Sequence, residues 1–146
     1  MPYVSSAPLV KEYILDKTDK LFKVEGEPTT IKVRQARMGE KRLRDDLYKK
    51  MERRYEGDSV IVSQDVSLDA VLRKEVFLTL AGSNIIAEDG KSSMFVFDGD
   101  RLKNENEFNM AWARLIPSVA DEILEKVLDM NPMWDFRLGE ILSKQD

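Results

Sequence analysis

The 146 residues of this chain include no histidine and no cysteine, the side chains most often used for catalysis near neutral pH and for zinc binding. Acid–base chemistry would therefore fall to the 27 Asp and Glu side chains. A glycosidase-like pair needs two carboxylates that face each other across a cleft, and no spacing in the sequence marks such a pair. The sequence therefore predicts a protein without enzymatic activity.

One acidic segment resembles the start of a calcium-binding loop, namely Asp98, Gly99 and Asp100. Such a loop requires a glycine at its sixth position and a bidentate glutamate at its twelfth, but Lys103 and Asn109 stand there. The glycines are scattered singly, so the sequence also lacks a glycine-rich loop of the kind that surrounds a phosphate. We expect a turn at this segment, and no metal site or cofactor.

Charge is unevenly distributed along the chain. Residues 31–55 contain ten basic and four acidic side chains, a net charge of +6, whereas residues 98–146 contain six basic and eleven acidic ones, a net charge of −5. A basic helix can neutralise phosphates along a nucleic acid, so DNA binding is one interpretation of the first segment. Asp45, Asp46 and Glu52 in that segment and the net charge of −4 of the whole chain argue against it. We expect protein partners and no nucleic acid.

Aromatic side chains near the C-terminus form a second candidate contact surface. Trp134 and Phe136 follow Pro132 in the acidic part of the chain. Such side chains most often pack in the core, but exposed aromatics are also favoured anchors for a partner, and both interpretations remain open. Together with the basic segment they give the candidate partner-binding residues, which are Met133, Trp134, Phe136, Lys41, Arg44 and Arg54.

Apolar stripes and capping residues predict the helices that must position these side chains. A first helix begins at residue 40, ends at Gly57 and buries a stripe formed by Leu43, Leu47, Met51 and Tyr55. Ser67 is expected to cap a second helix that ends at Gly82. Asn104, with a glutamate three residues later, caps a third, and Pro117 opens a fourth.

Strands are predicted where β-branched and polar residues alternate. Residues 30–35 show this alternation, and residues 60–62 form a short β-branched run. Two apolar segments within residues 85–97 flank the pair Asp89-Gly90, which favours the positive φ of a hairpin turn.

The domain organisation follows from these elements. Residues 1–28 contain three prolines and little periodicity, which predicts an extended N-terminal arm, and residues 29–146 are expected to form a single domain. Residues 135–142 form either one more short helix or a tail. The fold class is therefore α+β, mainly helical with four or five helices, a small antiparallel sheet and the extended arm.

The order of these pieces points to a family. The elements are, in order, a strand with IKVRQA at 31–36, a charged helix from residue 40, an apolar helix with LRKEV at 72–76, a turn at 98–102 and AWARLIPSVADEILEKVLDMNPMW at 111–134. This order resembles the tail assembly chaperones of long-tailed bacteriophages over about 100 residues, outside the N-terminal arm.

The resemblance implies a non-enzymatic protein that coats the helical tape measure protein before the tail tube polymerises, self-associates and is absent from the finished virion. It supplies no active-site residues. Seven methionines in a highly charged chain agree with a protein that binds an irregular apolar client. The alternatives are a virion structural component, such as a tail or neck protein, and a regulator that binds DNA through the basic helix.

The expected location is the host cytoplasm. The first residues lack the basic start and the apolar segment of a secretory signal, so we do not expect secretion. No apolar run approaches the roughly 20 residues that span a bilayer, and we expect no contact with a membrane.

Overall fold

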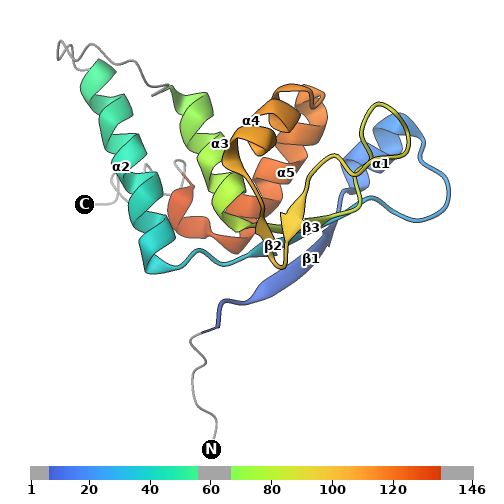
Figure 1. The fold of residues 1–146 in the computed structure, drawn as a ribbon, viewed down its shortest axis with the longest axis horizontal. Coiled ribbons are helices and arrows are strands. Elements are labelled where there is room, and N and C mark those ends of the chain that lie inside the picture. Colours follow the sequence, from blue (N-terminus) through green and yellow to red (C-terminus); the bar gives the residue numbers. More distant parts are fainter. Residues whose placement is uncertain (1–6, 56–66, 136–146) are drawn as a thin grey trace, which may run out of the picture.

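The computed structural model describes residues 7–55 and 67–135. Within them the chain forms five α-helices, five strands and one short 3-10 helix. These elements are β1 (Val10–Ile14), α1 (Asp16–Phe22), β2 (Thr30–Arg34), α2 (Met38–Tyr55), α3 (Leu68–Thr79), β3 (Leu80–Ser83), β4 (Phe97–Asp98), β5 (Arg101–Leu102), α4 (Glu105–Ala113), α5 (Pro117–Met130) and η1 (Pro132–Trp134). Figure 1 shows the helices gathered over one side of a small sheet. The predicted α+β class, mainly helical with a small antiparallel sheet, is confirmed.

The main sheet has the strand order β1-β2-β3, and both pairs of neighbours are antiparallel. The central strand shows the predicted alternation, because Ile31 and Val33 are fully buried while Lys32 between them is exposed. The buried face packs against the helices, and the strand predicted at 30–35 is confirmed. A second, two-stranded sheet consists of β4 and β5.

The prediction of a separate N-terminal arm is wrong for the described part of residues 1–28. The first strand, β1, pairs with β2 along its whole length. Leu15, directly after β1, is fully buried and belongs to the hydrophobic core. Because strand pairing joins residues far apart in the sequence, three prolines and weak periodicity gave no sign of it.

The following helix, α1, is held by a carboxylate from a distant helix. The backbone N–H groups of Lys17 and Thr18 donate to the two oxygens of Glu122 in α5, at 3.2 and 2.8 Å. The first N–H groups of a helix have no partner within the helix, so this buried carboxylate replaces an N-cap side chain. The N-terminal segment therefore shares the core of the domain and is part of it.

The central helix, α3, begins as predicted and ends differently. Ser67 Oγ accepts a hydrogen bond of 3.2 Å from the N–H of Ala70. The helix ends at Thr79 and not at Gly82, because the chain passes directly into β3, which pairs with β2. Gly82 instead makes room within the sheet, since the Cδ of Lys32 lies 3.3 Å from the place that a Cβ of Gly82 would occupy.

The last two helices also begin where their capping signals predicted. Asn104 Oδ1 accepts a hydrogen bond of 3.1 Å from the N–H of Glu107, and Pro117 is the first residue of α5. Except for Asp135, the segment 135–142 lies outside the described residues. Among the helices that the structure describes, none is long and apolar enough to cross a lipid bilayer.

The hairpin predicted within residues 85–97 forms as a short antiparallel pairing around Gly90, but it does not join the main sheet. Gly90 has a φ of 73°, and one isolated bridge joins Ile86 to Ser93. The longer pairing that follows, between β4 and β5, was not predicted. The strand predicted at 60–62 and the helix end at Gly57 lie outside the described residues.

Candidate functional site

The charged helix α2 buries charged side chains against the rest of the domain. Glu40, Arg44 and Met51 are buried, and their spacing of four and seven residues places them on one face of the helix. Leu43, which the sequence placed on the buried stripe, is 54% exposed. That part of the prediction is wrong, because the ion pairs described below decide which face of α2 turns inward.

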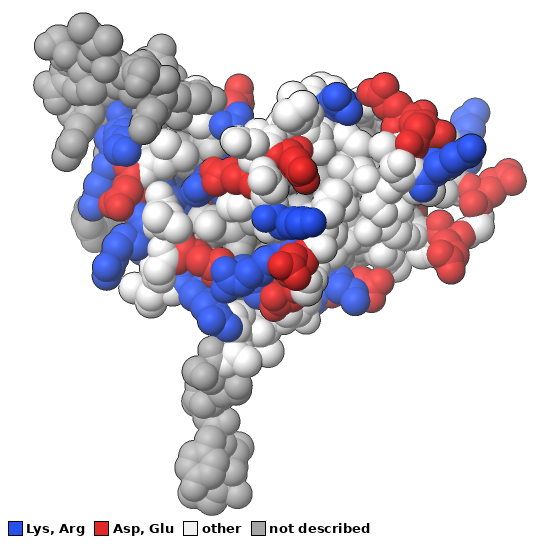
Figure 2. Space-filling view, in the orientation of Figure 1, with Lys and Arg blue, Asp and Glu red and all other residues white. Residues whose placement is uncertain are grey.

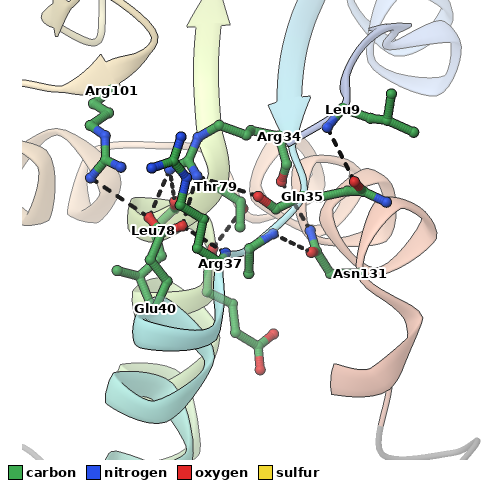
Figure 3. Close-up of polar contacts among 11 residues, drawn as sticks. Leu9, Arg34, Gln35, Arg37, Glu40, Leu78, Thr79, Arg101 and Asn131 are labelled. Atoms are coloured by element: carbon green, nitrogen blue, oxygen red, sulfur yellow. Dashed lines mark hydrogen bonds and ion pairs between the residues drawn. The ribbon is translucent and has the colours of Figure 1, made fainter. Parts of the chain in front are cut away.

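The first of these ion pairs joins the end of β2 to the start of α2 (Figure 3). Two guanidinium nitrogens of Arg34 donate to the two carboxylate oxygens of Glu40 at 2.7 and 2.8 Å. The same carboxylate accepts a hydrogen bond of 2.9 Å from the N–H of Arg37, and Arg34 also donates to the carbonyl of Leu78 at 2.6 Å. Burial by itself would raise the pKa of Glu40, but these donors outweigh burial and hold it below its usual value.

The second ion pair joins α2 to α3. Arg44 Nε donates to Glu75 Oε2 at 2.8 Å, and a further nitrogen of Arg44 donates to the carbonyl of Trp134 at 3.4 Å. Glu75 is fully buried, and its other carboxylate oxygen has no hydrogen-bond partner among the described residues. Burial raises the pKa of Glu75 to about 7, although the hydrogen bond and the charge of Arg44 oppose the rise.

A buried asparagine completes this polar network. Asn131, at the end of α5, accepts from the N–H of Ala36 at 2.8 Å and donates to the carbonyls of Arg34 and Val127 at 3.2 and 3.3 Å. Figure 3 shows Asn131 and Glu40 approaching the end of β2 from two different helices. The network therefore fixes α2, α3 and α5 around one end of the sheet.

This polar network has a structural role. Glu40 and Glu75 are turned inward and bind arginines, so neither is presented to a substrate. The described residues contain no group of acidic side chains arranged to hold a metal ion. The network determines where α2 lies. The position of α2 in turn leaves a surface exposed between α2 and its neighbouring helices.

That surface is a groove between α2, α3 and α4, with a volume of about 430 Å³. Its apolar part is formed by Leu43 and Leu47 of α2 and by Phe77 of α3. Charged and polar side chains surround it, and these are Asp46, Lys50, Arg73, Lys74, Glu105 and Asn109. The groove thus has an apolar floor and a charged rim.

Charges of both signs are arranged around this groove. Lys74 Nζ lies 2.9 Å from each carboxylate oxygen of Glu105 and 5.5 Å from the centre of the Phe77 ring. Figure 2 shows Lys and Arg side chains concentrated over α2, with acidic side chains more numerous toward the opposite end of the molecule. Glu105 of α4, from the acidic part of the sequence, lies on the rim beside the basic helix α2.

The basic candidates for partner binding do not form a free contact surface. Lys41 Nζ lies 2.7 Å from Asp45 Oδ2, one turn further along α2. Arg44 is buried, so the prediction of an accessible contact at this residue is wrong. Arg54 lies in the last turn of α2, and its side chain is outside the described part of the structure.

The aromatic candidates separate as well. Trp134 is 1% exposed and belongs to the core, with the guanidinium of Arg44 5.8 Å from the centre of its ring. The core interpretation is thus correct for Trp134, and the docking interpretation is wrong. Met133 beside it is exposed, and Phe136 lies outside the described residues.

Sequence reasoning missed the residues that position the groove, but one signal was present. Glu75 stands four residues after Val71 and one before Val76, on the apolar stripe of α3. A charge on an apolar stripe predicts a buried partner of opposite charge. The partner itself, Arg44, follows only from the packing of α2 against α3.

In comparisons with known proteins, no family model, no curated protein and no solved structure matches the chain. A functional proposal therefore depends on the groove and on the order of elements in the sequence.

Proposed function

We propose that this chain is a non-enzymatic tail assembly chaperone that self-associates and binds the tape measure protein in the host cytoplasm during tail morphogenesis. The groove between α2, α3 and α4 is the observation that carries the proposal. An amphipathic helix binds by laying its apolar face into a groove of this kind. A largely helical client offers many such faces, and covering them keeps it from aggregating.

The groove is available because α2 is held by other contacts. The ion pairs of Arg34 with Glu40 and of Arg44 with Glu75 lie on the inner face of the helix. Leu43 takes no part in these ion pairs and is more than half exposed. An exposed leucine and a partly exposed phenylalanine, Phe77, line the same groove. Together they offer a client helix an apolar contact for reversible binding.

Co-expression with a tape measure protein tests the proposal. The wild-type chain is expected to co-purify with this client and to keep it soluble. Leu43→Asp places a charge on the floor of the groove and should reduce the captured client about tenfold, because one well-placed contact often carries that much binding energy. Ile116→Asp is the matched control, since Ile116 is also exposed but does not line the groove. Unchanged melting temperatures would show that neither variant is unfolded.

Other outcomes would assign the chain differently. Loss of capture in Met133→Asp, with capture retained in Leu43→Asp, would move the contact surface to the C-terminal segment. Failure to capture any tape measure protein, with recovery of the chain from purified virions, would favour a structural component of the tail or neck. Submicromolar, salt-dependent binding to duplex DNA would favour the regulator, although Lys41 and Arg44 already form ion pairs within the protein.

A further inference from the structure

No described residue pairs with the outer edge of the first strand, β1. It is the outer strand of the order β1-β2-β3, and in Figure 1 it runs along the lower border of the sheet. Leu9 O accepts from the N–H of Gln35, and Leu15 N donates to the carbonyl of Thr29. In an antiparallel ladder the residues that bond to the partner strand alternate with residues whose backbone groups point away from it. The N–H and C=O groups of Val10, Glu12 and Ile14 therefore face outward.

The side chains of the same residues are also open. Val10 and Ile14 are 47% and 48% exposed although both are β-branched and apolar, and Glu12 between them is exposed. Lys32 stands directly opposite Glu12 in the ladder, but its Cδ leans over Gly82 on the far side of β2. Glu12 makes no ion pair among the described residues. Within the part of the chain that the structure describes, this edge therefore has outward backbone groups without a partner and an exposed apolar–acidic–apolar pattern.

We propose that this edge binds an extended segment of a partner protein as an added antiparallel strand. Main-chain hydrogen bonds to the outward groups of β1 supply the affinity, and alternate side chains supply the specificity. The segment carries Lys or Arg opposite Glu12, with an apolar residue two positions away on each side, opposite Val10 and Ile14. This site lies on the sheet and is separate from the groove for a helical client.

A second copy of this chain is a poor occupant of the edge. An antiparallel pair of β1 strands with full overlap places Val10 opposite Ile14 and Glu12 opposite the Glu12 of the other copy. Like charges directly opposite each other destabilise strand pairing. Shifting the register by two residues toward the N-terminus places Pro8, which has no N–H, in the ladder. Glu12 therefore disfavours self-pairing and selects a basic partner.

The test uses two synthetic heptapeptides, acetylated and amidated at their ends, with the sequences Thr-Val-Thr-Lys-Thr-Val-Thr and Thr-Val-Thr-Glu-Thr-Val-Thr. Titration of the full chain, followed by NMR of its backbone amides, gives the affinity for each and the residues that bind. The basic peptide is expected to bind about fivefold tighter, the size of one favourable cross-strand charge pair. Binding should also slow hydrogen exchange at the N–H groups of Val10, Glu12 and Ile14.

Three variants sharpen the test. Glu12→Lys should reverse the preference between the peptides, whereas Glu25→Lys makes the same change of charge at an exposed residue outside the strands and should leave it unchanged. Val10→Pro removes an outward N–H without removing a hydrogen bond to β2, so it should lower the affinity for both peptides. A circular dichroism spectrum of each variant checks the fold.

Several results would overturn the proposal. They are the absence of binding of either peptide at millimolar concentration, equal affinity for the two peptides, or a preference that Glu12→Lys does not change. Exchange protection that appears outside β1 would place the peptide elsewhere. Dimerisation of the chain alone, with protection of the same amides, would make a second copy the occupant.

Discussion

Two buried ion pairs attach the same helix to the same domain, and they differ in how many hydrogen bonds each carboxylate receives. Glu40 accepts two bonds from Arg34 and one from the N–H of Arg37. Glu75, buried more completely, accepts one bond from Arg44, and its second oxygen has no partner among the described residues. Their pKa values are displaced in opposite directions, downward for Glu40 and upward for Glu75.

The difference shows that burial alone does not decide the charge state of a carboxyl group. Burial raises the pKa in both cases, and the number of donors decides whether the carboxylate remains the stable form. The pair of Arg34 with Glu40 is therefore a fixed connection between β2 and α2. The pair of Arg44 with Glu75 is weaker near neutral pH, because Glu75 takes up a proton there.

The largest effect is expected from Arg34→Ala. The substitution leaves Glu40 buried without its partner, which should lower the free energy of unfolding by about 3–5 kcal/mol. Urea denaturation at pH 7 measures the loss. Arg42→Ala is the matched control, since Arg42 is an exposed arginine on the same helix, and a change of less than about 0.5 kcal/mol is expected there.

A double variant separates the two causes of that loss. Arg34→Met combined with Glu40→Leu removes both charges, and it should recover much of the lost stability, because no unpaired charge remains buried. A double variant as unstable as Arg34→Ala would show that specific hydrogen bonds, such as the one to Leu78, matter more than the unpaired charge.

The second effect is a pH dependence that belongs to Glu75. Its pKa is raised from 4.5 to about 7 in the folded chain, so the unfolded chain releases the proton first as the pH rises. The free energy of unfolding should therefore fall between these pH values, by on the order of 3 kcal/mol from this group. Glu75→Gln should remove this part of the pH dependence, measured by urea denaturation at several pH values from 5 to about 8.

The contribution of Glu40 has the opposite sign and a different pH window. Its pKa is lowered from 4.5, so its stabilisation is present above that value and is lost as the pH falls through the folded pKa. Measurements above pH 4.5 therefore separate the contribution of Glu75 from that of Glu40. Glu25→Gln, a change at an exposed carboxylate, should leave the profile as in the wild type. A constant difference between wild type and Glu75→Gln at every pH would contradict the assignment.

The smallest effect is expected at a partly exposed ion pair on the same helix. Lys41 and Asp45 lie 2.7 Å apart, but water reaches both side chains and screens their attraction. Lys41→Ala should lower the free energy of unfolding by less than about 0.5 kcal/mol. A loss above about 1 kcal/mol would mean that this pair, too, helps to attach α2 to the domain.

The sequence predicted where the helices begin better than it predicted which of their side chains are buried. Ser67, Asn104 and Pro117 lie where α3, α4 and α5 begin, because capping depends on atoms within one turn of the chain. The buried stripe of α2 was predicted with Leu43 inside, and the structure places Glu40 and Arg44 inside instead. Apolar spacing could not show this, since the partners of these charges lie on other elements.

The groove could be predicted only in part. Leu43 and Leu47 were recognised as apolar positions of one helix, but their exposure depends on how α2 docks against α3. For Trp134 the sequence leaves a core role, the commoner one, and a docking role both open, and its burial depends on contacts with α2 and with the core. A binding surface is what remains after the core is formed, and so it is the last feature that a sequence pattern specifies.

The sequence by itself determined the α+β class, the strand at 30–35 and the capped helix starts, because each depends on propensities and hydrogen bonds between near neighbours. Only the tertiary structure decided that residues 10–14 form an edge strand, that the chain passes from α3 directly into β3, and that buried arginines hold α2. These features join residues far apart in the chain. Strand pairing and the burial of a charge are favourable only when the distant partner is in place.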